Sequence, residues 1–375
     1  MKILLTNFHE GDGGGHTTYL MALARGLRDR HEIHVAAPPT SRLFLEAATV
    51  EGIRTVAQPF PNGLGKLTAS LRARRQLHAY LRQHAFDIVH VNGSADHRLV
   101  LAALRGAEYA PRIVLTKHNS KPIAGFGHRW RAKRTHLVLA VSDYTRHMLE
   151  TSAYAGLPIV TVRNGVDTGY FHPWPADAVA AERARHAEDA TLLLGSNAGT
   201  ADHKGWMDLI EAVAMLDDDK RRQVRVLLCG KPLSPAQSAR LEALGLRDRV
   251  RHLGMLDDVR PMIAAIDAGF VLSYAVETIS FACREMMAMG KPVLISDYAG
   301  LPENIEPGVD GWCVPVRDRA AIARAVAEML EDPARLADMG CHAAGHAERE
   351  FGLAGFVSST EAAYATVRSG RSFAE

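Results

Sequence analysis

Residues 272–295 read LSYAVETISFACREMMAMGKPVLI, and this stretch carries most of the information about fold and function. A strand-like run (GFVLSY) leads to Glu277, and an amphipathic helix is predicted to begin near Ile279 or Ser280 and to contain Glu285. In a parallel α/β sheet such a helix begins at the carboxyl edge of the strands, where backbone N–H groups favour phosphate. Two carboxylates there could accept hydrogen bonds from sugar hydroxyls. Alternatively, Glu277 caps the helix and Glu285 is solvated on its outer face.

The length of the chain predicts two domains. At 375 residues it exceeds the usual limit for one hydrophobic core, and its 47% hydrophobic residues can fill two. No stretch approaches the ~20 uninterrupted apolar residues that span a bilayer, and the N-terminus KILLTNF becomes polar too soon for a secretory signal. We therefore expect a cytoplasmic protein.

Charge is divided unevenly between the two halves. Residues 1–165 carry 22 Lys and Arg against 11 Asp and Glu, whereas residues 166–375 carry 22 against 31. A basic first half suits an anionic acceptor or peripheral contact with the inner face of a membrane, and we expect no nucleic-acid partner. The alternative is a charge-complementary contact between the two domains.

Short apolar runs alternate with amphipathic helical runs along the chain. The strand-like runs are KILLTN, EIHVAA, IRTVAQ, DIVHVN, RIVLTKH, LVLAVS and IVTVRN, then TLLLGS, RVLLCG, VRHLG, GFVLSY and PVLISD. The stretch NGVDTGYFHPWPADA, residues 164–178, interrupts this pattern. We predict an α/β fold of two Rossmann-like, doubly wound domains, 1–165 and 166–375, whose ligand edges face a cleft. Three helical segments end the chain, and they could pack back on the first domain.

A glycine-rich loop, FHEGDGGGH, follows the first predicted strand. Gly14 and Gly15 would let the backbone approach an anion at the start of the next helix. The loop fits neither GK[ST] nor GxGxxG, and the same glycines could serve only tight packing.

Other candidates also follow predicted strands. His118 comes after RIVLTK and could touch a substrate hydroxyl, although a histidine is as often structural. Ser142 and Asp143 follow LVLAV, and the serine or the aspartate is expected to cap the next helix rather than to react. Lys204 precedes a helix and could reach a diphosphate, although an isolated lysine is usually solvated. The loop containing Met255 could present backbone groups to a nucleotide base.

Metal and redox motifs are absent from the sequence. It contains no HExxH, GxSxG or Cys/His cluster, and no DxD apart from the acidic run at 217–219, so we predict no metal ligands and no metal-dependent transfer. The acidic run Asp217 to Asp219 is interpreted as a solvated loop. The cysteines are widely spaced without a CxxC pair, which predicts reduced packing residues.

Taken together, the motifs resemble those of the GT-B glycosyltransferases of retaining family 4. The matching segments, in order, are GGGH, HN after TK, VSDYT, NGVDTGYFHP, KG before LIEA, VRHLG, and E-x7-E followed by MAMGKPVL. The resemblance implies two Rossmann-like domains, with a nucleotide diphosphate sugar (UDP- or GDP-sugar) on the second and the acceptor mainly on the first. It implies no metal and no other cofactor.

Residue by residue, the resemblance assigns Glu285 to the ribose hydroxyls and Glu277 to the donor sugar. Lys204 would neutralise the departing phosphate, and His118 would contact the transferred sugar. The remaining groups that it implies at the donor are Gly14, Gly15 and the amides of Ile279, Ser280 and Phe281.

Two segments depart from the family pattern. EGFG is replaced by Glu277-Thr278-Ile279-Ser280, which loses both glycines, and GRLxxxKG is replaced by GSNAGTADHKG, which loses an arginine. Asn197 or Ser196 could occupy the space of that arginine.

The leading hypothesis is a retaining glycosyltransferase that moves a hexose-type sugar to an anionic glycan or glycolipid of the cell envelope, of the lipopolysaccharide or lipid-linked oligosaccharide type. The alternatives are a nucleotide-sugar epimerase or phosphorylase of the same fold, and a non-catalytic sugar-nucleotide-binding protein.

Overall fold

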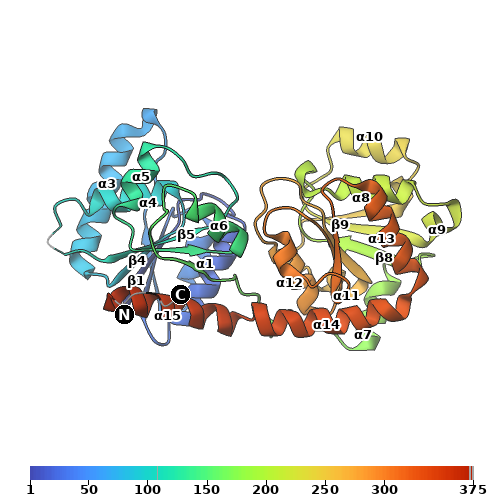
Figure 1. Ribbon diagram of the computed structural model, residues 1–375. Helices are drawn as coiled ribbons and strands as arrows, with labels where there is room; N and C mark the ends of the chain where they lie inside the picture. Colours follow the sequence, from blue (N-terminus) through green and yellow to red (C-terminus); the bar gives the residue numbers. More distant parts are fainter. Residues whose placement is uncertain (108, 371–372, 374–375) are drawn as a thin grey trace. The chain divides into compact units, whose positions relative to one another are not determined.

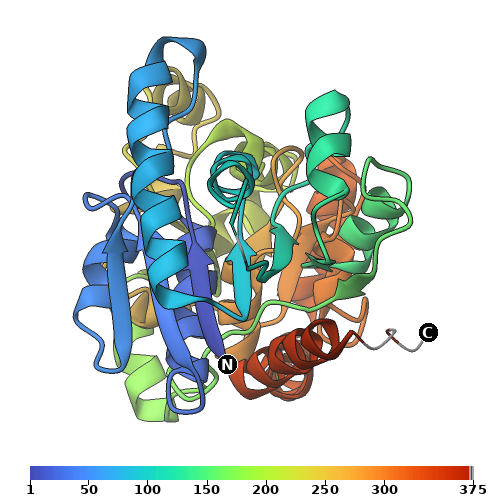
Figure 2. The same ribbon diagram turned by 90° about the vertical axis from the view of Figure 1, so that its left-hand side faces the viewer.

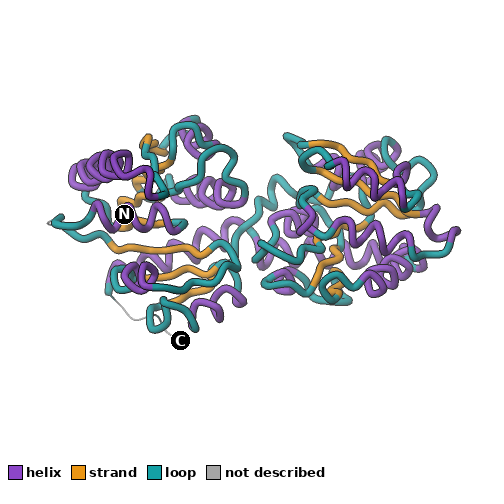
Figure 3. Tube along the Cα trace, turned by 90° about the horizontal axis from the view of Figure 1, so that it is seen from above, coloured by secondary structure: helices purple, strands orange, loops and turns teal. Residues whose placement is uncertain are grey.

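The computed structural model describes residues 1–107, 109–370 and 373, and the chain divides into two compact units (Figure 1). Unit 1 comprises residues 1–165 together with the C-terminal segment that begins at Leu353, and unit 2 comprises Val166–Gly352. In each unit the strands of a parallel sheet lie between helices (Figure 3).

Unit 1 contains a sheet with the strand order β3-β2-β1-β4-β5-β6-β7. The strands are β1 (Lys2–Thr6), β2 (Glu32–Ala37), β3 (Ile53–Ala57), β4 (Ile88–Val91), β5 (Arg112–Lys117), β6 (Leu137–Ala140) and β7 (Ile159–Thr161). The helices are α1 (Gly15–Leu27), α2 (Arg42–Ala48), α3 (Leu67–His84), α4 (Ser94–Ala103), α5 (Phe126–Ala132), α6 (Asp143–Glu150) and α15 (Leu353–Ser369), with a 3₁₀ turn η1 (Leu64–Lys66).

Alternate residues of these buried strands supply two apolar faces. Leu4 and Ala36 pack with the apolar residues of α3, which runs along one face of the sheet (Figure 2). On the other face, α15 packs beside α1, where a Cβ added to Gly26 would lie 2.3 Å from Val357 Cγ2. That contact explains why residues from Leu353 onward group with unit 1, whereas the sequence prediction extended the second domain to residue 375.

Unit 2 contains a sheet with the strand order β10-β9-β8-β11-β12-β13. The strands are β8 (Leu192–Ser196), β9 (Val224–Cys229), β10 (Val250–Gly254), β11 (Ala268–Val271), β12 (Val293–Ser296) and β13 (Gly311–Val314). The helices are α7 (Ala176–Ala184), α8 (Trp206–Ala214), α9 (Asp218–Gln223), α10 (Pro235–Ala243), α11 (Arg260–Ala265), α12 (Phe281–Ala288), α13 (Arg319–Glu331) and α14 (Pro333–Phe351). The 3₁₀ turns are η2 (Asp202–Lys204), η3 (Arg247–Arg249) and η4 (Leu301–Asn304).

The core of unit 2 also has two layers. Leu192 and Leu194 of β8 face one way, toward Trp206 of α8 and the apolar residues of α13, while Leu193 faces the layer that contains Met286 of α12. The alternation of helices and parallel strands confirms the predicted α/β class with two Rossmann-like, doubly wound domains.

Two local predictions for unit 2 are wrong. The strand β13 was not predicted, because GWCV is short and half-buried and follows a Gly-rich turn. The acidic run at 217–219 is not a loop: Asp217 caps α9, its side chain accepting a hydrogen bond from the Lys220 N–H at 2.8 Å, and Asp218 and Asp219 form the first turn. Among the described residues, no helix is both long and apolar enough to cross a bilayer.

Candidate active site

The order of strands in each sheet reverses at one point, and ligands of doubly wound sheets bind beyond the carboxyl ends of the strands at such points. In unit 2 this switch point lies between β8 and β11. Residues after these two strands, together with α12, bring together four of the predicted site residues, namely Asn197, Lys204, Glu277 and Glu285.

Glu285 is half-buried and hydrogen-bonded to a side chain of the neighbouring loop. It lies in α12 between the buried residues Arg284 and Met286, and Asn197 Nδ2 donates a hydrogen bond to its Oε2 at 2.6 Å. Burial raises the pKa of Glu285 to about 7, an effect that the bond from Asn197 partly offsets. The alternative of a solvated Glu285 is therefore wrong.

Asn197 also offers an acceptor. Its Oδ1 is buried with no hydrogen-bond partner among the described residues. Buried polar atoms are nearly always paired, so such an atom at a switch point indicates where a ligand hydroxyl would donate.

Glu277 forms an ion pair with Lys204. Lys204 Nζ lies 2.7 Å from Glu277 Oε2, and Ser273 Oγ donates to the same oxygen at 3.4 Å. Glu277 is not a helix cap, because Ser280 has that role: its Oγ accepts a hydrogen bond from the Cys283 N–H at 3.2 Å. The alternative for Glu277 is therefore wrong as well.

The backbone holds this ion pair in place. Gly205 has φ +70°, and a Cβ built there would lie 1.9 Å from the carbonyl oxygen of Leu272, so only glycine allows the loop after β8 to approach the end of β11 so closely. The Tyr274 N–H donates to the carbonyl of His203 at 3.0 Å and joins the same two loops. Val276 adopts φ +58°, a strained conformation for a β-branched residue, directly before Glu277.

The other predicted donor residues lie along the same edge. Ile279 and Ser280 are buried before α12, and Phe281 is the first residue of that helix. Met255 follows β10 with an exposed side chain, and the preceding Gly254 carbonyl accepts from the Gly230 N–H at 2.9 Å. Backbone groups near Met255 therefore lie at the outer strand of the sheet.

His118 lies at the corresponding edge of unit 1, near the switch point between β1 and β4. Its Nε2 is 2.8 Å from Asn92 Oδ1, and Asn92 Nδ2 donates to the Thr6 carbonyl at 3.1 Å. Asn92 therefore presents its oxygen to the ring, so Nε2 of His118 carries the proton and donates. Burial, assisted by the neighbouring His16, holds the pKa of His118 well below its ordinary value, which makes the ring neutral.

The glycine-rich loop is tightly packed at Gly13 and open at Gly14. At Gly13 an added Cβ would lie 2.5 Å from Thr17 Oγ1, which is tight packing. Gly14 caps α1 with φ +52°, and a Cβ there would meet nothing within 4 Å, so space is open beside it. Gly15 is the first residue of the helix.

The sequence analysis missed several polar groups of unit 1. Asp96 is buried and accepts hydrogen bonds from the Asn92 N–H at 2.7 Å and from Thr6 Oγ1 at 2.8 Å, and burial raises its pKa to about 7. His16 and Tyr19 pack against the His118 ring, with centroids 4.2 and 4.6 Å away. The position of Asn92 at the end of DIVHVN was the available signal. Ser142 Oγ accepts from the Thr145 N–H at 3.1 Å, which confirms it as a cap.

The family Glycosyltransferase Family 4 matches residues 13–170, and Glycosyl transferases group 1 matches residues 190–332. The chain is 27% identical over 328 residues to a phosphatidyl-myo-inositol mannosyltransferase of Mycolicibacterium smegmatis, covering 85% of this chain and 82% of that protein. It is 28% identical to a D-inositol 3-phosphate glycosyltransferase of Streptomyces scabiei, covering 94% and 86%.

Solved structures share the fold at low identity. A glycosyltransferase from Rickettsia africae superposes with a TM-score of 0.84 at 18% identity, over 98% of both chains. The Anabaena protein HepE in complex with UDP superposes with a TM-score of 0.82 at 22% identity, over 98% of this chain and 100% of that one.

Two doubly wound domains in tandem form the GT-B fold, which the glycosyltransferase from Rickettsia africae shares. The chain belongs to family 4 of the glycosyltransferases.

Proposed function

We propose that the chain is a retaining, metal-independent hexosyltransferase that transfers a sugar from a UDP- or GDP-sugar to a glycan or glycolipid of the cell envelope. The observation that carries this proposal is the joint placement of the Asn197–Glu285 and Lys204–Glu277 pairs at the switch point of unit 2.

The donor would use both pairs. Glu285 accepts hydrogen bonds from the ribose hydroxyls once it is ionised, and Asn197 Oδ1 offers a second acceptor beside it. Lys204 supplies positive charge to the diphosphate, and Glu277 accepts from hydroxyls of the sugar. The amides of Ile279, Ser280 and Phe281 lie at the start of α12, where a helix favours an anion.

The chemistry requires little beyond positioning and charge. The bond from the sugar's C1 to the diphosphate oxygen breaks, and the acceptor oxygen bonds to C1 on the same face. The departing phosphate oxygen takes the proton of the acceptor, so no protein base is needed. Lys204 stabilises the charge that develops on this leaving group.

The acceptor class is suggested by the relatives and by charge. Relatives are named for phosphatidyl-myo-inositol and inositol 3-phosphate, and both of these acceptors are anionic. The basic first half of this chain suits such a group better than a neutral glycan. We favour a phosphorylated glycolipid and retain lipopolysaccharide-type and lipid-linked oligosaccharide acceptors as members of the test panel.

Peripheral contact with the inner membrane face would use α3. Leu67 and Leu71 are 68% and 47% exposed, and Arg72 and Arg75 are exposed on the same helix. Apolar side chains beside basic ones suit an anionic lipid surface. Another basic run, HRWRAKR at residues 128–134, offers less charge to a surface than its sequence indicates, because Arg131 is buried. Flotation with anionic liposomes tests this contact, and a failure to bind at any salt concentration would remove it.

The enzyme assay separates the alternatives. UDP- and GDP-sugars are incubated with and without an acceptor panel, in buffer containing EDTA, and the product anomer is determined by NMR. Transfer with the donor's anomeric configuration supports the proposal. A change in the donor alone would indicate an epimerase, release of a sugar phosphate from a glycan with phosphate would indicate a phosphorylase, and binding without turnover would indicate a binding protein.

A further inference from the structure

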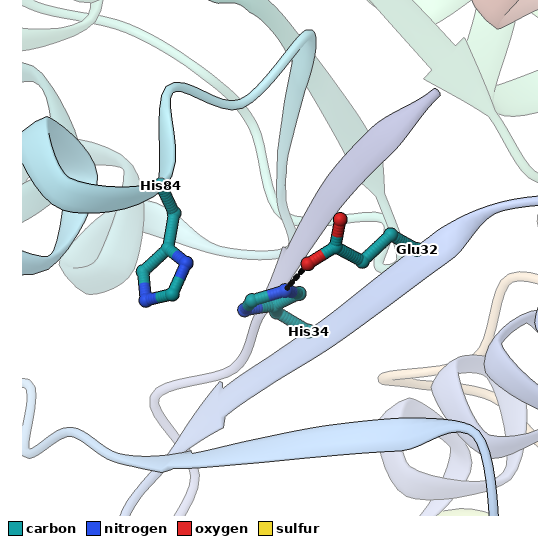
Figure 4. A group of neighbouring side chains, drawn as sticks. All are labelled: Glu32, His34 and His84. Carbon is teal, nitrogen blue, oxygen red and sulfur yellow. Dashed lines mark hydrogen bonds and ion pairs between the residues drawn. The ribbon is translucent and has the colours of Figure 1, made fainter.

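A group of metal-ligating side chains lies at the amino edge of the unit 1 sheet, where the strands begin. Glu32 and His34 occupy alternate positions of β2 and share the face covered by α3, whose last residue is His84. In the part of the chain that the structure describes, these side chains bring three ligand atoms within 4.8 Å of one another (Figure 4). The residues come from β2 and from the end of α3, and the carboxyl-edge residues of the candidate active site lie at the other end of the strands.

We propose that Glu32, His34 and His84 bind a first-row divalent transition metal ion, with Zn²⁺ as the natural candidate. Two imidazoles and a carboxylate match the ligand preference of zinc, and a water molecule can complete a tetrahedral site because Glu32 and His84 are only half-buried.

The spacing of the ligand atoms fits this ion after a small movement. Tetrahedral zinc with bonds of ~2.0–2.1 Å holds its ligand atoms about 3.4 Å apart. His34 Nε2 and Glu32 Oε1 are already 3.0 Å apart. The required adjustment falls on His84, which ends its helix next to Ala85, a residue in the left-handed conformation.

A partner for the second nitrogen of His34 is also present. Tyr80 Oη lies 2.5 Å from His34 Nδ1. Without metal, the Tyr80 hydroxyl donates to Nδ1 and the proton on Nε2 is donated to Glu32. With metal on Nε2, the proton moves to Nδ1 and Tyr80 becomes the acceptor, an arrangement that fixes the tautomer of ligating histidines.

Two positively charged side chains lie beside Glu32 and would repel the metal ion. Arg54 NH1 lies 2.9 Å from Glu32 Oε1, and Lys2 Nζ lies 3.4 Å from Oε2. Arg54 is 64% exposed and can turn toward water when the metal enters. Because its positive charge repels the ion, replacing Arg54 should strengthen metal binding, an effect not expected of histidines that bind metal adventitiously.

The test uses the full-length, tag-free protein after treatment with EDTA. It is titrated with Co²⁺ and followed by visible absorption, and a second sample is titrated with Zn²⁺ in a calorimeter. We expect one tight site with a tetrahedral Co²⁺ spectrum. His84→Ala and Glu32→Gln should each weaken it at least about tenfold, Tyr80→Phe about tenfold, and Arg54→Gln should tighten it about threefold or more. His147→Ala, at an exposed position of α6, is the matched control and should leave the affinity unchanged.

The outcomes separate the proposal from nonspecific binding. Circular dichroism establishes whether each variant is folded. If His84→Ala does not fold, the test of the ligands rests on Glu32→Gln. Wild-type affinity in both ligand variants, a purely octahedral Co²⁺ spectrum, or an equal loss in His147→Ala would overturn the site.

Discussion

Lys204 Nζ and Glu277 Oε2 lie 2.7 Å apart, and their side chains are only 21% and 12% exposed. Since both charges are largely removed from water, each depends on the other, and removal of one leaves the other uncompensated. Under the proposed function, a diphosphate that approaches Lys204 would meet an ammonium group that is already paired with Glu277. The diphosphate and the Glu277 carboxylate would then share this ammonium group.

Replacing Lys204 by Met should therefore damage stability and activity separately. Lys204→Met leaves Glu277 unpaired and should lower the free energy of unfolding by about 1–3 kcal/mol. The double variant Lys204→Met/Glu277→Gln should recover most of this loss, while transfer stays reduced by roughly 10²-fold or more. Urea unfolding and initial rates measure the two effects. Wild-type donor affinity and rate in Lys204→Met would contradict the role of this residue.

Donor binding should depend on pH through Glu285. Its pKa is raised to about 7 by burial, so the carboxyl is mostly protonated at pH 6 and mostly ionised at pH 8. If the ribose hydroxyls donate to the carboxylate, donor affinity should rise about tenfold between these values. Glu285→Gln should bind weakly and show no such rise. Calorimetry should use the intact nucleotide sugar, because the terminal phosphate of a free nucleotide titrates near pH 6. A parallel rise in the variant would exclude Glu285 as the cause.

The same group should make unit 2 less stable at high pH. Its folded pKa of about 7 lies above the ordinary value of 4.5. The folded protein therefore binds the Glu285 proton more tightly than the unfolded chain does. The stabilisation from this proton is complete below pH 4.5 and is lost as pH rises through 7. Glu285→Gln should remove this loss and gain up to about 3 kcal/mol at pH 8 relative to wild type. Urea unfolding followed by tryptophan fluorescence reports mainly on unit 2, which contains Trp174, Trp206 and Trp312, whereas unit 1 contains Trp130. Equal pH profiles of the variant and the wild type would disprove the effect.

Much of the fold could be predicted because its signals are local. Buried parallel strands are nearly continuous apolar runs, and TLLLGS and DIVHVN show this directly. Elements whose stability comes from packing were missed: β13 has the unremarkable sequence GWCV and pairs with β12, and α9 is a polar segment started by the Asp217 cap.

The sequence indicates the candidate site residues but not the contacts between them. Strand ends identify Asn197, Glu277 and His118, because the carboxyl edge of a parallel sheet collects ligand groups. The bond from Asn197 to Glu285 spans 88 positions, and the metal-ligating group joins β2 to the end of α3. Such tertiary pairings leave no periodic trace in the sequence.

Gly205 should tolerate no side chain. Gly205→Ala places a Cβ against the Leu272 carbonyl and imposes φ +70° on alanine, so it should destabilise unit 2 by at least about 2 kcal/mol more than Gly199→Ala. Gly199 is the matched control, since it also has positive φ (+96°) but its added Cβ would meet nothing within 4 Å. Thermal unfolding compares the two. Equal losses would show that the close approach to Leu272 relaxes readily.

His118 should affect transfer without affecting donor binding. It belongs to unit 1, whereas the proposed donor groups Asn197, Glu285 and Lys204 belong to unit 2, so His118→Ala should leave the nucleotide-sugar Kd unchanged. Its neutral ring, held through Asn92, can exchange hydrogen bonds with a substrate hydroxyl, and its loss should lower kcat roughly 10²-fold. Calorimetry and steady-state rates on the same preparation separate the two quantities, with exposed His147→Ala as the control. A weakened Kd at constant kcat would instead assign His118 to donor binding, and no change in either would remove it from the site.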